Sequence, residues 1–140
     1  MSVLATLAAA AALLAGQSST IAFMDEAEQA ALLASADCTT ADGVAEGFSS
    51  WSGATLRLGN TAWIGAARYV FAYDVSTSGS TSNLRPIMLA FPESQPVMTR
   101  QQARAANRQL REQLAQWRLT PVEGARAQSG CLGWVDVSAR

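Results

Sequence analysis

The feature that most constrains the fold is an apolar stretch near the middle of the chain, YVFAYDV at residues 69–75. The side chains of a strand point alternately to the two faces of a sheet. One face of this stretch would carry Tyr69, Phe71, Tyr73 and Val75, and the other would carry Val70 and Ala72. Because both faces are largely apolar, the pattern predicts a central strand, within residues 61–75, that is covered on both sides.

Further strands are expected before and after this one. Residues 54–58 alternate between apolar and polar side chains, which predicts a half-buried strand. The polar stretch STSGSTSN at 76–83 predicts a hairpin loop, and residues 84–91 would form the returning strand. Its residues on one face would be Ile87, Leu89 and Phe91. Pro86 has no N–H group, so this strand should begin at a sheet edge or a bulge. A short last strand is expected at 130–138.

Two segments have the composition of helices. Residues 21–35 are rich in strong helix formers and carry acids early, where the helix dipole favours them. Residues 100–118, RQQARAANRQLREQLAQWR, follow a T-x-x-Q capping box made by Thr99 and Gln102, and a proline lies beyond their far end. Glycines and turn-forming residues at 38–50 predict a loop.

Together these elements predict an α+β fold with the order α-β-β-β-α-β. A small antiparallel sheet of three to four strands would carry an N-terminal helix and a C-terminal, amphipathic, arginine-rich helix. A chain of 140 residues with 49% hydrophobic residues has the length of one domain, and it can bury a core of its own. That domain is expected to span residues 19–140.

Residues 1–18 have the pattern of a signal peptide. The apolar run at 3–15 is too short to span a bilayer comfortably, and small and polar residues follow it, as they do at a secretory cleavage site. Its start carries no arginine or lysine, which departs from the usual pattern. The preferred prediction is export to the periplasm or the medium. The alternative is that residues 3–15 stay on as a membrane anchor or assembly helix, and membrane contact is expected only in that case.

Two cysteines, Cys38 and Cys131, lie far apart in the sequence. In an exported protein this number predicts one disulfide between them, whereas in the cytosol both would be buried thiols. Two cysteines in a chain without histidine make a poor metal site. No metal ion or other cofactor is therefore expected.

The helix expected at 100–118 has two distinct faces. Its apolar residues fall within an arc of about 80° on a helical projection. They are Ala103, Ala106, Leu110, Leu114 and Trp117. Five arginines occupy a second arc of about 80° beside the first. They are Arg100, Arg104, Arg108, Arg111 and Arg118, and Glu112 is the one acid within the segment. The pattern predicts a helix that packs on one face and is strongly basic along the flank of that face.

Three interpretations of these arginines remain open. The acids of 21–50 and the arginines, all at Arg57 or later, could pair within the molecule, with the helix at 21–35 supplying the carboxylates. The arginines could instead bind an acidic protein or an anionic envelope surface. Nucleic acid is disfavoured, because no aromatic residues alternate with the arginines and the net charge is −1.

Aromatic residues offer two weaker candidates for partner contact. Trp51 follows a glycine-containing stretch, so it is the tryptophan expected to be most exposed. The aromatic face of residues 69–73 is expected to be core, but it would become an interface if helices left it uncovered.

The residue types present exclude several kinds of catalysis. Without histidine or lysine, the chain has no Ser-His, Cys-His or Ser-Lys nucleophile pair. Carboxylate chemistry is the one remaining route, through Asp74, Glu93, Glu123 and Asp136, whose spacing carries no signature. The sequence therefore predicts a non-enzymatic accessory or structural subunit of the bacterial cell envelope. The alternatives are a membrane-retained subunit and a small carboxylate-dependent enzyme, and the oligomeric state stays open.

Overall fold

The computed structural model describes residues 19–139 apart from 41, 54, 60–65 and 92–98, and it shows an α+β fold. Two helices, α2 (Glu26–Ala34) and α3 (Arg100–Leu114), accompany two sheets in the described ranges. The main sheet has the strand order β1-β5-β4-β7-β3. Its strands are β1 (Ser19–Ala22), β5 (Thr81–Phe91), β4 (Ala66–Val75), β7 (Gln128–Ala139) and β3 (Arg57–Leu58). The second sheet pairs β2 (Phe48–Ser52) with β6 (Arg118–Pro121).

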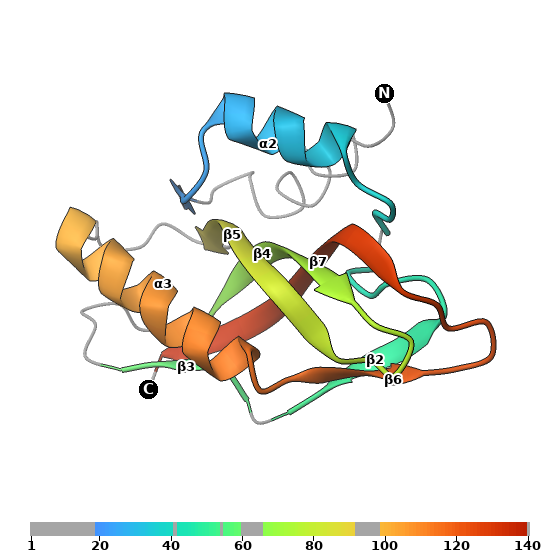
Figure 1. Cartoon of the computed structure of the whole chain (residues 1–140). Coiled ribbons are helices and arrows are strands. Elements are labelled where there is room, and N and C mark those ends of the chain that lie inside the picture. The colour runs from blue at the N-terminus through green and yellow to red at the C-terminus, as the bar shows by residue number, and fades with distance from the viewer. Residues whose placement is uncertain (1–18, 41, 54, 60–65, 92–98, 140) are drawn as a thin grey trace.

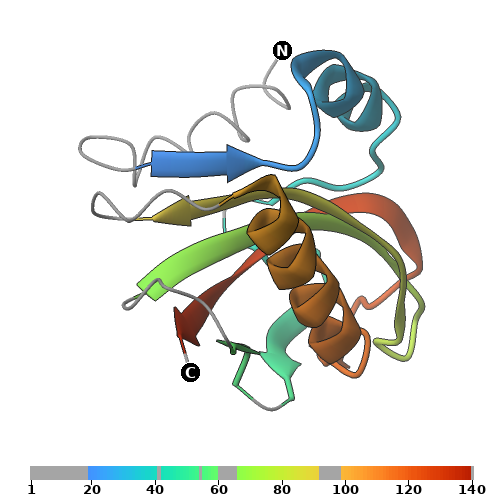
Figure 2. The ribbon, with the colours of Figure 1, turned by 90° about the vertical axis from the view of Figure 1, so that its left-hand side faces the viewer.

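The two helices cover opposite faces of the main sheet (Figures 1 and 2). On one face, α3 and the two-stranded sheet enclose the larger part of the core, which contains the β4 residues Tyr69, Phe71, Tyr73 and Val75. On the other face, Leu32 and Leu33 of α2 contact Val70 and Ala72 of β4. The prediction of a central strand covered on both sides is confirmed, since β4 pairs with β5 and with β7 and is buried on both faces.

The predicted helix at 21–35 begins too early. Ile21 and Ala22 belong to β1, which pairs antiparallel with the end of β5. The helix starts after Asp25, whose carboxylate accepts a hydrogen bond from the Glu28 N–H while the Glu28 side chain accepts one from the Asp25 N–H. This D-x-x-E capping box fixes the first turn, and it leaves the apolar residues before it free to pair as a strand.

The sequence patterns did not predict the second sheet, and they predicted too long a helix for the arginine-rich segment. The loop expected at 38–50 ends too late, because residues 48–50 already belong to β2. The arginine helix ends at Leu114, and β6 begins at Arg118. β6 needs extended backbone to pair with β2, and a pairing of segments so distant in sequence leaves no local pattern.

The strand predicted at 54–58 is described only as β3, Arg57–Leu58. Its expected alternation is confirmed, because Leu56 and Leu58 are buried while Thr55 and Arg57 are exposed. β3 runs parallel to β7, so the expected all-antiparallel sheet is wrong at this edge. The last strand is also longer than predicted, because β7 spans twelve residues and lies between β4 and β3.

A bulge near Ile87 shapes β5, because the register with β4 shifts there. Ile87 joins the core facing α2, whereas Leu89 and Phe91 join the core facing α3. The prediction that all three share one face is therefore wrong, because a bulge inserts an extra residue and turns the following side chains over. The predicted bulge near Pro86 is confirmed. β1 pairs only with residues 88–91, so Pro86 also lies on the part of β5 that β1 does not cover.

The predicted disulfide between Cys38 and Cys131 is present. It ties the segment that follows α2 to β7, beside an isolated parallel bridge between Thr39 and Leu132. The apolar segment at 1–18 lies outside the described residues. Neither α2 nor α3 has the length and apolar character that a bilayer-spanning helix needs.

Candidate functional site

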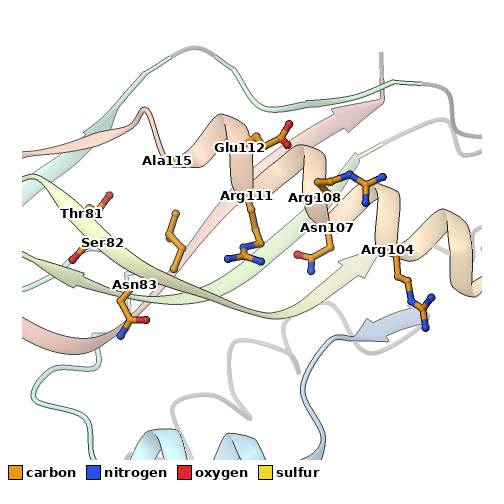
Figure 3. Close-up of a pocket in the computed structure, with 10 residues that line it drawn as sticks. Thr81, Ser82, Asn83, Arg104, Asn107, Arg108, Arg111, Glu112 and Ala115 are labelled. Carbon is orange, nitrogen blue, oxygen red and sulfur yellow. The ribbon is translucent and has the colours of Figure 1, made fainter.

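An open groove of about 750 Å³ lies between α3 and the start of β5. The helix side of the groove carries most of its charge, and the strand side is polar with one apolar residue (Figure 3). Its lining is Thr81, Ser82, Asn83, Leu84, Arg104, Asn107, Arg108, Arg111, Glu112 and Ala115. Three of the five arginines singled out from the sequence are thus brought to one cavity.

The arginines face this groove because packing fixes the rotation of α3. Thr99 and Gln102 form the predicted capping box, with both reciprocal hydrogen bonds in place. The buried side of the helix is held by Ala106, Leu110 and Leu114. The predicted apolar stripe is confirmed in its centre, and the flank next to it holds the exposed residues Arg104, Arg108 and Arg111.

Those three arginines form no ion pair with any carboxylate in the described part of the chain. The two ion pairs found there join Arg68 to Asp136 and Arg85 to Asp74. The expected pairing of the arginine helix with the acids of 21–35 is not formed, because α2 packs on the opposite face of the sheet. The groove therefore offers three guanidinium groups with no acceptor among the described residues.

A buried tyrosine orients a fourth donor in the groove. The hydroxyl of Tyr69, which is 1% exposed, donates to the side-chain oxygen of Asn107 at 3.2 Å. Burial raises the pKa of Tyr69 well above its usual value, an effect larger than the opposing influence of the nearby Arg111 charge. The hydroxyl thus stays protonated, and it holds the Asn107 amide so that its NH₂ group faces outward. Arg104, Asn107 and Arg111 extend from the same side of α3, while Glu112 points away from them (Figure 3).

The strand side of the groove is poorly suited to pairing with an added strand. Pro86 has no N–H to donate. Asn83 lies within a second bulge of β5 and has a positive φ of 53°. Its carbonyl already accepts a hydrogen bond from Arg85 Nε at 2.9 Å. Bulges and prolines of this kind protect sheet edges from edge-to-edge pairing. A ligand of this groove must therefore be held mainly by side chains.

The remaining candidate residues lie elsewhere. Arg100 is exposed at the first residue of α3 but does not line the groove. Arg118 lies on β6, and its guanidinium donates to the Ser78 carbonyl at 3.1 Å. Trp51 is half-buried, and its ring packs edge-on against Phe71 and Tyr73. Trp51 was expected to be the most exposed tryptophan; Trp117 and Trp134 are half-buried as well, and the Trp51 indole N–H donates to the Gly43 carbonyl.

The aromatic face of β4 is also closed to partners. Tyr69, Phe71 and Tyr73 are each no more than 1% exposed, because α3 and the two-stranded sheet cover them. The preferred interpretation of this face as core is confirmed. Its alternative use as an interface is wrong, because the β2–β6 pair, which was not predicted, completes the cover.

The carboxylates considered for catalysis are not brought together in the described residues. Asp74 accepts hydrogen bonds from Arg85, Asn83 and the Gly130 N–H, and Asp136 pairs with Arg68. Glu123 is exposed, and Glu93 lies outside the described residues. A second cavity of about 370 Å³ places Asp74 near Asp37, but Asp37 accepts the Ser129 N–H. The described residues contain no group of three or more side chains suited to a metal ion.

Comparisons of the chain with models of protein families, with curated proteins and with solved structures find no match. The groove must therefore be interpreted from its own chemistry. Sequence reasoning found its arginines through their helical spacing, but it missed Asn107 and the β5 residues. Asn107 lies three residues after Arg104 and four before Arg111, so the same helical spacing could have found it.

Proposed function

We propose that this protein is an exported, non-enzymatic binding subunit of the cell envelope, and that the groove between α3 and β5 holds an anionic partner. The observation that carries the proposal is the row of three arginines that have no carboxylate partner among the described residues, with the oriented Asn107 amide among them. Arginine pairs with carboxylates and phosphates through two parallel hydrogen bonds. A groove that presents several such groups is suited to binding a partner that carries more than one negative charge.

Export is supported by the disulfide between Cys38 and Cys131, since such bonds persist in oxidising compartments. The signal-like pattern at 1–18 points the same way. Intact mass of the natively expressed protein, with and without reduction and alkylation, tests this part. Loss of the first residues with both thiols blocked supports export, whereas a full-length chain with two free thiols contradicts it. A full-length chain with an intact disulfide would favour the membrane-retained subunit.

Binding is favoured over catalysis by the state of the carboxylates. Two of the acids considered for catalysis, Asp74 and Asp136, are engaged in internal ion pairs. The groove itself contains one acid, Glu112, which points away from the arginines (Figure 3). General acid-base catalysis by two carboxylates needs both at one reacting bond. The groove therefore fits a holding role.

The groove is tested by binding of a fluorescently labelled oligoglutamate peptide, followed by anisotropy at low salt. The double variant Arg104→Gln/Arg111→Gln removes two charges while keeping side chains of comparable reach. We expect it to weaken binding by at least about tenfold, because it removes charge-assisted hydrogen bonds.

The matched control for this test is Arg126→Gln, which changes an exposed arginine in the segment between β6 and β7 that does not line the groove. It should leave the affinity for the peptide almost unchanged. Because the control removes one charge and the groove variant two, an equal loss of binding free energy per charge removed would mean that the peptide responds only to overall charge. That result would contradict the proposed site.

A further inference from the structure

A second surface of opposite charge lies on the far side of the main sheet. The first turn of α2 and its cap carry Asp25, Glu26 and Glu28, and all three are exposed. None of them forms an ion pair with an arginine in the described ranges. The capping box uses hydrogen-bonding capacity of Asp25 and Glu28 but brings no described cationic side chain to their carboxylates. We call these three residues the acidic end of α2.

The outward side of α2 next to this acidic end is flat and apolar. Leu32 and Leu33 face the sheet and are buried, whereas the alanines on the outward side are exposed. They are Ala27, Ala30, Ala31 and Ala34. A helix surface of small side chains allows another surface to approach closely, and it loses little side-chain entropy when it is covered.

The fold keeps the two charged surfaces apart. The acidic end of α2 and the arginines of α3 belong to helices that pack on opposite faces of the same sheet (Figure 2). Charge complementarity that the sequence suggested within one chain therefore cannot be realised inside one molecule. It can be realised between two molecules.

We propose that the partner of the groove is a second copy of this chain, which inserts the acidic end of its α2 between α3 and β5. This inference rests on the proposed function, and it names the partner. The carboxylates of the incoming helix pair with Arg104, Arg108 and Arg111, and its alanines cover the apolar part of the groove at Leu84 and Ala115. A helix that lies in a groove is a common mode of recognition.

An acidic polypeptide fits this groove better than a phosphate-bearing ligand does. Phosphate sites commonly use free backbone N–H groups at the start of a helix. The lining residues of α3 run from Arg104 onward, beyond the first turn, so their N–H groups are used within the helix.

The resulting contact joins two different surfaces, so it is head-to-tail. Each copy offers one groove and one acidic end, and neither is consumed by the other within the molecule. Contacts of this type build rings if their rotation closes, and open chains if it does not. The proposed assembly is therefore extendable, and it depends on salt because charge pairing holds it.

Sedimentation velocity of the natively expressed protein over a range of concentrations tests the inference. We expect the weight-average sedimentation coefficient to rise with concentration at low salt, and to return to the monomer value in about 0.5 M salt, where the Debye length is only a few ångströms. A coefficient that stays at the monomer value at low salt, up to the highest concentration reached, would overturn the inference.

Two matched variants sharpen the test. The groove variant is Arg104→Gln/Arg111→Gln, and the acidic-end variant is Asp25→Asn/Glu26→Gln/Glu28→Gln. Asparagine is a good N-cap and glutamine can complete a capping box, so the second variant keeps the start of α2. We expect each variant alone to self-associate at least about tenfold more weakly than the unchanged protein. Arg126→Gln serves as the control and should associate normally.

A mixture of the two variants gives the decisive result. The groove variant keeps a working acidic end, and the acidic-end variant keeps a working groove. They should form a 1:1 dimer that does not extend, because the two remaining surfaces of that dimer are both disabled. If the mixture forms no dimer although each variant keeps the thermal stability of the unchanged protein, the inference is overturned.

The oligoglutamate assay separates this inference from the proposed function. Peptide binding in the groove without self-association leaves the proposed function standing and overturns the second copy as partner. Neither peptide binding nor self-association overturns both. Binding of anionic phospholipid vesicles in preference to the peptide assigns the groove to a lipid surface, and it too overturns the inference.

Discussion

The two faces of the main sheet are packed very differently. The face under α3 is broad and aromatic: rings of β4 and Trp51 contact one another, and a second sheet closes its lower side (Figure 1). The face under α2 is small and aliphatic, with Leu32 and Leu33 as the buried residues of the helix. α3, which bears the groove, is therefore held by an extensive packed core, whereas α2 is held by a few buried residues and by the disulfide that follows it.

Removal of the disulfide should have the largest effect on stability, and it should destabilise α2 more than α3. The bond spans 93 residues of sequence, and the chain-entropy relation gives a stabilisation of about 4–5 kcal/mol for a loop of that length. We expect Cys38→Ala/Cys131→Ala to lower the free energy of unfolding by about this amount in urea titrations. Amide hydrogen exchange should rise first in α2, since Cys38 closely follows it. Equal acceleration in α2 and α3 would contradict the contrast between the faces.

Truncation of one large side chain on each face compares the two cores directly. Phe71 is 0% exposed under α3, and Leu33 is 6% exposed under α2. We expect Phe71→Ala to cost about 3–5 kcal/mol and Leu33→Ala about 2–3 kcal/mol, because the second site lies at the rim of a thin core and can relax. Chemical unfolding of both variants measures the difference. A larger loss for Leu33→Ala would reverse the order of the two faces.

Alkaline pH should act on the α3 face. Burial raises the pKa of both Tyr69 and Tyr73, whose rings lie there. The unfolded chain releases their protons above a pH of about 10, and the folded chain does not, so stability falls as pH rises above that value. The fall should approach about 1.4 kcal/mol per tyrosine for each further pH unit. Tyrosinate absorbance should therefore appear together with unfolding, and an earlier appearance would contradict the burial of these rings.

The smallest expected effects come from the two helix caps. Thr99→Ala and Asp25→Ala each remove a side chain that accepts a hydrogen bond from the third helical residue. Each change should cost about 1 kcal/mol of stability. Thr99→Ala should also weaken oligoglutamate binding slightly, because it loosens the helix that holds the groove. Asp25→Ala should leave that binding unchanged, which makes it the matched control.

Local patterns predicted the parts of this fold that local physics determines. The alternation at 69–75 indicated a strand buried on both faces, and the Thr99–Gln102 box indicated the start of α3, because each rests on neighbouring residues. The β2–β6 pair and the parallel β3 edge escaped prediction, because they depend on partners dozens of residues away. Pro86 indicated a bulge in β5, but the sequence did not show that Ile87 is the extra residue, because a bulge is defined by its register with the opposite strand.

The candidate site was half predictable. Helical spacing brought the arginines of α3 together, and the structure keeps Arg104, Arg108 and Arg111 on one groove. Arg118 was lost from the set because β6 takes it out of the helix. The role of Asn107 depends on Tyr69, a residue 38 positions earlier in the chain, and no local pattern connects the two.

The disulfide also decides how the molecule would respond to tension. A pulling force applied between the segment before α2 and the end of β7 would run through the bond between Cys38 and Cys131. The β4–β5 hairpin and α3 lie between those two cysteines in the chain, so the load would bypass them. Stretching would peel away β1, α2 and the part of β7 that follows Cys131, after which the cross-link would stop further extension. Both elements of the groove, β5 and α3, lie inside the cross-linked loop and would carry none of this load.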